Sequence, residues 1–276
     1  MDYKRVLTIQ DISCVGQCSL TVALPILSAC GVETCVLPSA VLSNHTGGFK
    51  GFTFRDLTED MPNIRRQWME NGLSFAAIYT GYLGSTKQIE YVRDIFRDNA
   101  AEGCVKVVDP AMADHGKLYV GFDAAFVEAM KGLCTVADYV IPNITESCLL
   151  TGIEYRTEYD RAYIEEHLAA LTALGCKNVI LTGISYVSDR TGIVVYEKGK
   201  YAYYEHEKLP NSCHGTGDIF ASSFVGALMR GNSAYRSAQI AADYAVACIR
   251  HTAKLDNHWY GAAFEPVLGE LIQALN

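Results

Sequence analysis

Short apolar segments alternate with amphipathic segments along the first half of the chain, and this alternation limits the possible folds more than any other feature. The apolar segments are Val6–Ile9, Thr34–Leu37, Phe75–Tyr79, Val105–Val108 and Tyr139–Ile141, and helical patterning separates them. Repeated strand–helix–strand units of this length imply a parallel sheet with helices on both faces. The sequence therefore predicts an α/β fold whose ligands bind where the parallel strands end.

The pattern changes after a strand expected near Asn178–Leu181. Ile193–Tyr196 and Tyr201–His206 flank Gly199-Lys200, which predicts an antiparallel hairpin in the C-terminal half. Three further helices are expected, at Thr216–Met229, Ala234–His251 and Phe264–Leu275. The sequence contains no linker, low-complexity tract or internal repeat, so residues 1–276 are expected to form one three-layer α/β/α domain with a mostly parallel sheet. The Ser43–Phe54 segment is expected to project from that sheet.

Composition excludes several classes of protein. The formal net charge of −8 argues against a nucleic-acid-binding protein, because affinity for a phosphate backbone requires clustered lysine and arginine. The first residues contain no apolar signal segment, and no apolar run is long enough to span a membrane. The ten cysteines are scattered, as expected for free thiols in a reducing compartment. We therefore expect a cytoplasmic protein that binds neither nucleic acid nor membrane.

A glycine-rich motif, Gly215-Thr216-Gly217-Asp218, lies where the first of the three C-terminal helices is expected to begin. Glycine lets the backbone approach a ligand closely, and the free N–H groups at a helix N-terminus suit a phosphate. Asp218 in the first turn can accept the proton of an attacking hydroxyl, because the loose transition state of phosphoryl transfer lets that proton leave late. The alternative is a helix start in which Asp218 only supports capping.

Further polar residues follow two of the expected strands. Asp109 and Asp114 come after the strand that ends at Val108, and Asn143 and Glu146 come after the next strand. Carboxylates and an amide at strand ends are the oxygen ligands that Mg²⁺ takes, usually with water and substrate phosphates. The alternative for each is a helix cap, for which Asp123, Thr145 and Glu146 are candidates.

At this point the sequence resembles the pyridoxal kinases of the ribokinase superfamily. The resemblance rests on four motifs in order along the chain: Ser43-Asn44-His45-Thr46-Gly47, Asp109-Pro110-x-Met112-x-Asp114, Pro142-Asn143-x-x-Glu146-x-x-Leu149-Leu150-Thr151-Gly152, and Gly215–Asp218. It implies a ribokinase-like fold and ATP-dependent phosphorylation of the 5′-hydroxymethyl group of a B6 vitamer. It also implies Mg²⁺, often K⁺, and a homodimer with one active site in each subunit.

The resemblance assigns roles to individual residues. Asp218 would be the catalytic base, and the amides of Gly215, Thr216 and Gly217 would form an anion hole. The residues that would contact ATP are Asp109, Asp114, Asn143, Glu146, Thr182 and Thr216, with Asp114 and Glu146 as metal ligands. Those that would contact the vitamer are Ser13, His45, Thr46, Tyr82 and Cys213. The alternatives are a polar loop residue for Ser13, an aromatic core residue for Tyr82 and a structural histidine for His45.

The sequence departs from the commonest pyridoxal kinases just before Gly215. Cys213-His214 stands where apolar residues are expected in those enzymes. The motif His-Gly-Thr-Gly is similar to the one in hydroxymethylpyrimidine kinases of thiamine synthesis, which share the superfamily. Those enzymes usually have cysteine at the position of Asp218, so we expect B6 vitamers as first substrates and the pyrimidine as second. Cys213 at a helix N-terminus is a candidate for a stabilised thiolate that adds to the aldehyde of pyridoxal. The alternative is an inert packing residue.

Other classes fit less well. A P-loop NTPase is excluded because Gly-x4-Gly-Lys-Ser/Thr does not occur. A dinucleotide-dependent oxidoreductase is disfavoured, because Gln10-Asp11-Ile12-Ser13 rather than Gly-x-Gly-x-x-Gly follows the first strand. A sugar kinase would need more hydroxyl-binding carboxylates or amides in the N-terminal half. A non-catalytic vitamer-binding protein would bind without releasing ADP and would not need Asp218.

Overall fold

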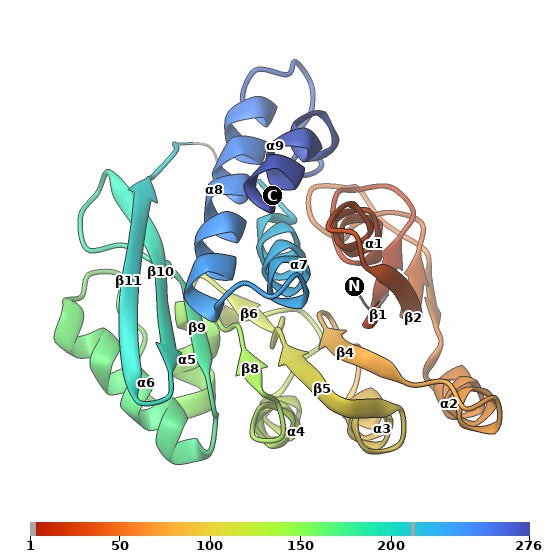
Figure 1. Ribbon diagram of the computed structural model, residues 1–276. Helices are drawn as coiled ribbons and strands as arrows, with labels where there is room; N and C mark the ends of the chain where they lie inside the picture. The colour runs from red at the N-terminus through yellow and green to blue at the C-terminus, as the bar shows by residue number, and fades with distance from the viewer. Residues whose placement is uncertain (1–3, 211–212) are drawn as a thin grey trace.

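A nine-stranded sheet runs through the centre of the molecule (Figure 1). The computed structural model describes residues 4–210 and 213–276. The strand order of the sheet is β11-β10-β9-β8-β5-β4-β1-β2-β3. The strands are β1 (Arg5–Ser13), β2 (Glu33–Leu42), β3 (Phe54–Asp56), β4 (Phe75–Thr80), β5 (Ala100–Val108), β8 (Tyr139–Val140), β9 (Val179–Ile184), β10 (Arg190–Glu197) and β11 (Lys200–Glu207), and a separate hairpin pairs β6 (Ala113–Asp114) with β7 (Lys117–Leu118).

The chain reverses its direction of travel across the sheet at β1. Strand β2 lies on one side of β1, whereas β4, β5, β8 and β9 follow one another on the other side, and all these neighbours pair in parallel. A ligand-binding crevice is therefore expected beyond the carboxyl ends of β1 and β4, because open α/β sheets bind their ligands at such a reversal. The predicted polar residue Ser13 is the last residue of β1, and Tyr82 lies two residues after the end of β4.

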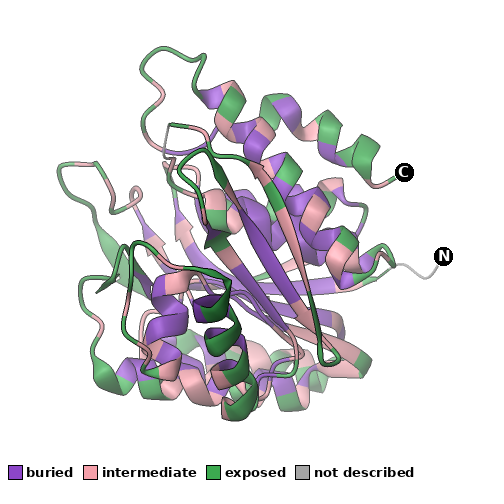
Figure 2. Ribbon diagram, turned by 90° about the vertical axis from the view of Figure 1, so that its left-hand side faces the viewer, coloured by how far each residue is buried: buried purple, intermediate pink, exposed green. Residues whose placement is uncertain are grey.

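Helices cover both faces of the sheet, as predicted. Their bounds are α1 (Leu20–Ala29), α2 (Met61–Glu70), α3 (Thr86–Asp98), α4 (Ala124–Cys134), α5 (Ile144–Thr151), α6 (Arg161–Leu174), α7 (Thr216–Met229), α8 (Ala234–Thr252) and α9 (Leu268–Ala274). One apolar core joins the sheet to α2–α6, and a second joins it to α1, α7 and α8. Helix α9 packs outside this second layer. Figure 2 shows the buried residues concentrated along the strands and on the inner sides of the helices.

Two local predictions are confirmed in detail. Helix α7 spans Thr216–Met229, the predicted range. Strands β10 and β11 form the predicted antiparallel hairpin, with Tyr196 opposite Tyr201. Its two-residue turn has φ of 51° at Lys198 and 79° at Gly199, and positive φ at both positions is the geometry that suits the twist of the flanking strands.

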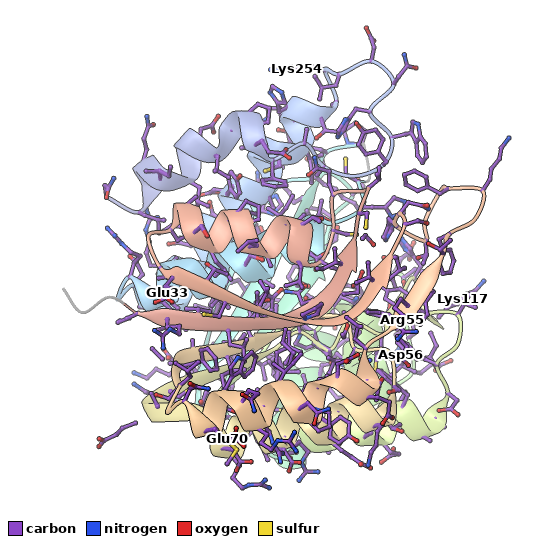
Figure 3. All side chains as sticks on the ribbon, turned by 90° about the vertical axis from the view of Figure 1, so that its right-hand side faces the viewer. Glu33, Arg55, Asp56, Glu70, Lys117 and Lys254 are labelled. Atoms are coloured by element: carbon purple, nitrogen blue, oxygen red, sulfur yellow. The ribbon has the colours of Figure 1, made fainter. Side chains whose placement is uncertain are left out.

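Several elements are absent from the sequence-based prediction. Helix α6 was not expected, and α5 was considered only through its candidate caps Thr145 and Glu146. Strand β3 was also missed, because its residues are all exposed and show no alternation. It pairs antiparallel with β2 and forms the edge of the sheet, where Figure 3 labels Arg55 and Asp56. Residues 43–53, which lead into β3, are exposed or half-buried, in line with the predicted projection.

Membrane insertion is not supported by any described helix. Across residues 4–210 and 213–276, none has both the length and the apolar composition that crossing a bilayer requires.

Candidate active site

The start of α7 is built so that its backbone stays open. Gly215 is the N-cap residue with φ of 78°, and no side chain caps this helix. A Cβ at Gly215 would lie 1.7 Å from the carbonyl oxygen of Gln17, so only glycine fits. A Cβ at Gly217 would meet nothing within 4 Å. The first-turn N–H groups have no intrahelical partners and carry the positive end of the helix dipole, which makes this end suitable for an anion.

Asp218 lies in that first turn and is half-buried. Burial raises the pKa of its carboxyl group from 3.8 to about 7, a hydrogen bond from the backbone N–H of Ser19 lowers it, and the negative charge of Asp11 raises it further. A carboxylate with a pKa near neutrality is a much better proton acceptor than an exposed aspartate. The structure thus gives Asp218 the property that a general base requires.

A second group of acids lies beside Asp218. Burial raises the pKa of Asp109 well above its ordinary value, and the charges of Glu146 and Asp218 add to that rise. Burial also raises the pKa of Glu146, although backbone N–H groups of Asn143, Met112 and Ala113 oppose the effect. Carboxylates that raise one another's pKa lie in a region of negative potential, which favours a bound cation.

Helix α5 begins differently, because its own side chains cap it. Asn143 Oδ1 accepts from the Glu146 backbone N–H at 2.9 Å, and Glu146 Oε2 accepts from the Asn143 N–H at 2.9 Å. Both residues also hold the segment before β6: Asn143 Nδ2 donates to the Ala113 carbonyl at 2.8 Å, and Met112 N–H donates to Glu146 Oε1 at 3.1 Å. The capping alternative from the sequence therefore applies to Glu146, together with Asn143.

The other two candidate capping residues, Asp123 and Thr145, differ in what they bind. Asp123 caps α4 by accepting from the Phe126 N–H at 3.0 Å. Thr145 instead accepts from the Gly116 N–H at 3.0 Å, which ties the β6–β7 hairpin to α5.

Two of the residues predicted to contact ATP occupy the neighbouring strand ends. Asp114 lies on β6, and its side chain is 54% exposed. Thr182 lies on β9, and its hydroxyl donates to the Pro142 carbonyl at 3.4 Å. Within residues 4–210 and 213–276, no three histidine, cysteine or acidic side chains are placed to hold a metal by themselves.

The predicted vitamer contacts Ser13 and Tyr82 lie at the β1–β4 crevice. Ser13 is buried and donates to Asp11 Oδ2 at 3.2 Å. Tyr82 is half-buried, and its ring stacks on Phe122 with centroids 5.5 Å apart. Burial raises the pKa of the Tyr82 phenol, and the charge of Asp11 raises it further. Both side chains thus lie near the strand ends on which the expected site depends.

The segment that contains His45 and Thr46 reaches the start of α7. The rings of His45 and His214 lie 5.0 Å apart, and a Cβ on Gly47 would come within 2.9 Å of both. Burial lowers the pKa of His45, and the neighbouring His214 lowers it further. Thr46 is exposed. A second contact, missed in the sequence, joins Phe49 to Trp259 with centroids 4.7 Å apart. Nothing in the local sequence around Trp259 points to that contact.

Cys213 lies just before the start of α7. It is half-buried against the core formed by α1, α7, α8 and α9. Burial raises the pKa of its thiol, so the surroundings favour the neutral form over the predicted thiolate. Thr216 Oγ1 donates to the Cys213 carbonyl at 3.4 Å.

A loop near the C-terminus ties two parts of the site together. Gln17, in the loop after β1, donates its N–H to the Tyr260 carbonyl at 3.2 Å and bridges to Gly261. Ala262 N–H donates to the His214 carbonyl at 3.1 Å. Residues 260–262 therefore fix the β1–α1 loop against the start of α7.

A cavity of about 310 Å³ lies between the β6–β7 turn and α5. Its lining residues are Gly116, Thr145, Cys148, Leu149, Gly152, Ile153 and Tyr155. Thr145 directly precedes Glu146, and Gly116 is two residues after Asp114, so the cavity borders the segments that carry these two acids.

The mostly parallel nine-stranded sheet with helices on both faces and the C-terminal hairpin confirm the predicted ribokinase-like fold, which the chain shares with a solved pyridoxal kinase. The chain belongs to the phosphomethylpyrimidine kinase family, whose sequence profile matches residues 24–263. The resemblance to pyridoxal kinases is confirmed as well, because the relatives of this chain include both pyridoxal kinases and hydroxymethylpyrimidine/phosphomethylpyrimidine kinases.

Solved structures support the same grouping. A Bacteroides thetaiotaomicron protein designated a phosphomethylpyrimidine kinase is 38% identical, with a TM-score of 0.93 and coverage of 98% of this chain and 94% of that one. A crystal form of a protein with the same designation contains pyridoxal. Pyridoxal kinase from Lactobacillus plantarum is 30% identical, with a TM-score of 0.89 and coverage of 99% and 98%. The pyridoxal kinase of Dictyostelium discoideum is 28% identical over 80% of this chain and 77% of its own length.

Proposed function

We propose that this kinase transfers the γ-phosphoryl group of ATP to the 5′-hydroxymethyl group of pyridoxal, pyridoxine and pyridoxamine. One observation carries the proposal: Asp218, with a pKa of about 7, lies at the uncapped start of α7. Ser13 and Tyr82 lie at the crevice where a vitamer would bind. The pyridoxal in the Bacteroides crystal form supports this choice of substrate.

In the proposed reaction, Asp218 accepts the proton of the vitamer hydroxyl as it attacks the phosphorus. General base catalysis contributes about 10²–10⁴-fold to rate. The backbone N–H groups of Gly215, Thr216 and Gly217 would stabilise the charge on the transferred group, because they are fixed before the reaction and need no reorganisation. Ser13, His45, Thr46, Tyr82 and Cys213 would hold and orient the pyridine ring.

The acids at the strand ends fit a magnesium ion that binds together with ATP. Asp114 and Glu146 would hold it, since Mg²⁺ usually takes one or two carboxylates with waters and substrate phosphates. When bound, it would neutralise negative charge on the phosphates. Asn143 and Glu146 also act through the backbone, because they hold Met112 and Ala113 next to Asp114. Asp109, Thr182 and Thr216 would complete the nucleotide contacts, and K⁺ would assist.

A second candidate substrate is hydroxymethylpyrimidine or its phosphate. The match to the phosphomethylpyrimidine kinase profile and the 38% identical Bacteroides protein favour it. His214, immediately before Gly215, adds a second imidazole next to His45 at the expected substrate end. Both candidates are small heterocyclic alcohols, so one assay separates them.

The test is ADP release from Mg–ATP with pyridoxal, pyridoxine, pyridoxamine, hydroxymethylpyrimidine or ribose, each with K⁺ or Na⁺. We expect turnover with the vitamers and, more slowly, with the pyrimidine. Asp218→Asn should lower turnover by about 10²–10⁴-fold. The control is Asp123→Asn, because asparagine caps a helix as well as aspartate does. Preference for ribose would favour a sugar kinase, and binding without ADP release would favour a vitamer-binding protein.

We further propose that residues 1–276 act as one kinase domain and that two chains assemble into a homodimer in the cytoplasm. Light scattering of the purified protein under assay conditions tests the assembly. A fully active monomer would contradict it.

A further inference from the structure

Helix α3 begins with a sequence that usually caps its own start, but the glutamine of that sequence makes its contacts elsewhere. Ser85-Thr86-Lys87-Gln88 has the spacing of a capping box, in which the glutamine side chain returns to the N–H of the N-cap residue. Ser85 Oγ does accept from the Gln88 backbone N–H, at 3.3 Å. The Gln88 side chain, however, is buried and bonds to other segments. Its amide therefore serves contacts outside its own helix.

The buried amide of Gln88 joins three parts of the chain. Its Oε1 accepts from the Gly84 N–H at 2.7 Å. Its Nε2 donates to the Ser39 carbonyl of β2 at 3.0 Å, to Thr58 Oγ1 at 2.9 Å and to Asp56 Oδ1 at 3.2 Å. These partners fix the orientation of the amide, because a backbone N–H only donates, whereas a carbonyl and a carboxylate only accept. The loop after β4 is thus tied to β2 and to the end of β3, where Figure 3 labels Asp56.

The loop that Gln88 holds carries Tyr82. Residues 81–84 lead from the end of β4 toward α3. At the start of this loop, the Gly81 N–H donates to a carbonyl of β1 at 3.1 Å. In its middle, Ser39 Oγ donates to the Tyr82 carbonyl at 3.3 Å. The bond to Gln88 fixes its last residue. The backbone on both sides of Tyr82 is therefore anchored by hydrogen bonds.

The ring of Tyr82 has contacts of a different kind. It stacks on Phe122 with centroids 5.5 Å apart, and Phe122 stacks on Phe126 of α4 with centroids 3.8 Å apart. Aromatic pairs keep their attraction over a range of offsets, whereas hydrogen bonds weaken steeply when their direction changes. The stacking therefore sets the plane of the Tyr82 ring, and the bonds to the loop backbone set where on that plane the ring lies.

We propose that Gln88 is a positioning residue for Tyr82: its amide holds the β4–α3 loop so that the Tyr82 ring is in place before the substrate binds. The proposal rests on the proposed function, in which Tyr82 contacts the vitamer. A loop that occupies its binding position for only part of the time weakens the apparent affinity by that fraction. Bound substrate selects the same position, so turnover at saturation is preserved. Loss of the amide should raise KM for the vitamer and leave kcat in place.

Gln88→Met tests this role, because methionine has a similar length and no amide. We expect KM for pyridoxal to rise about three- to tenfold, while kcat and KM for Mg–ATP stay within about twofold of the parent values. A second measurement needs no turnover. Hydrogen exchange at the Gly84 N–H, followed by NMR, should be faster in the variant, because this N–H has lost its acceptor.

A double-mutant cycle tests whether Gln88 acts through Tyr82. In a Tyr82→Ala background the ring is absent, so adding Gln88→Met should change KM for pyridoxal by less than about twofold. The full rise in that background would overturn the proposal, because it would mean that the amide affects the site by another route.

The matched control is Asn99→Leu, which removes another buried amide of similar shape. Asn99 is the C-cap residue of α3 and donates to the Leu73 carbonyl at 3.3 Å, near the start of β4 rather than its end. This variant should lose stability without a change in KM for pyridoxal. An unchanged KM or unchanged Gly84 exchange in Gln88→Met, or an equal rise in KM in Asn99→Leu, would overturn the proposal. Absence of ADP release by the parent protein with every vitamer would sink the proposed function instead, since the exchange measurement reads the loop without turnover.

Discussion

Helices α5 and α7 begin near the same edge of the sheet, but their first turns are built in opposite ways. Asn143 and Glu146 cap α5 reciprocally, so its terminal N–H groups have partners within the chain. Gly215 starts α7 in a left-handed conformation, and no side chain caps that helix. A capping residue typically stabilises a protein by about 1 kcal/mol. Helix α7 forgoes that contribution, which leaves its terminal N–H groups available to an anion.

The largest effect is expected from Gly215→Ala, which disturbs the uncapped start of α7. The new Cβ would lie 1.7 Å from the Gln17 carbonyl oxygen, and the left-handed φ of 78° disfavours alanine as well. The backbone must move, and a displacement of about 1 Å near reacting groups can lower turnover by about 100-fold. Steady-state kinetics and ADP titration calorimetry would measure the loss.

Gly217→Ala is the matched variant for this test. A Cβ at Gly217 meets nothing within 4 Å, so the protein should fold and melt like the parent. If it folds normally but binds ADP weakly, the space next to Gly217 is where the phosphate lies. Parent-like turnover in Gly215→Ala would remove the reason for calling this helix start an anion site.

A smaller effect is expected from Asp218, in the first turn of α7, on how stability varies with pH. The pKa of Asp218 is raised to about 7, so the folded state binds this proton more tightly than the unfolded state. Stability from this group is therefore present at low pH and is lost as the pH rises from about 4 through 7. Asp218→Asn should stabilise the protein at pH 8, by about 3 kcal/mol more than at pH 4.5.

Urea denaturation of this variant and of Asp123→Asn at both pH values would measure the difference. A gain that is equal at pH 4.5 and pH 8 would mean that Asp218 ionises without a penalty in the folded protein.

The smallest effect is expected at the capped helix. Asn143→Ala removes the bond to the Glu146 N–H and the bond to the Ala113 carbonyl. Stability should fall by about 1 kcal/mol. Because Asp114 follows Ala113, we also expect KM for Mg–ATP to rise a few-fold while kcat stays unchanged. A large fall in kcat without loss of stability would show that α5 takes part in the chemistry directly.

The sequence was informative wherever local patterns determine local structure. The recurrence of Phe220, Phe224 and Leu228 gave the bounds of α7 and placed Asp218 in its first turn. Helix α6, which was not predicted, has equally clear local signals, because Asp160 caps its start and Gly175 follows its end. Strand β3 offered no such pattern, since an exposed edge strand of three residues has no buried face.

The properties of the site depend on contacts between distant parts of the chain, which explains why they were not predicted. The pKa of Asp218 is raised by burial, lowered by the hydrogen bond from Ser19 and raised by the charge of Asp11, and both of these residues lie about 200 positions earlier in the chain. The half-buried position of Cys213, which raises the pKa of its thiol, likewise depends on packing that its helix-terminal place in the sequence does not show.

The hydrogen bonds that join residues 260–262 to Gln17 and His214 also set an order of events during synthesis. All the strands of the sheet precede residue 210, and domains start to fold while the ribosome is still adding residues. The contacts that fix the β1–α1 loop against the start of α7 cannot form until Ala262 has been added and has left the exit tunnel. A nascent chain therefore carries every candidate site residue for some time before these contacts can hold the start of α7 in place.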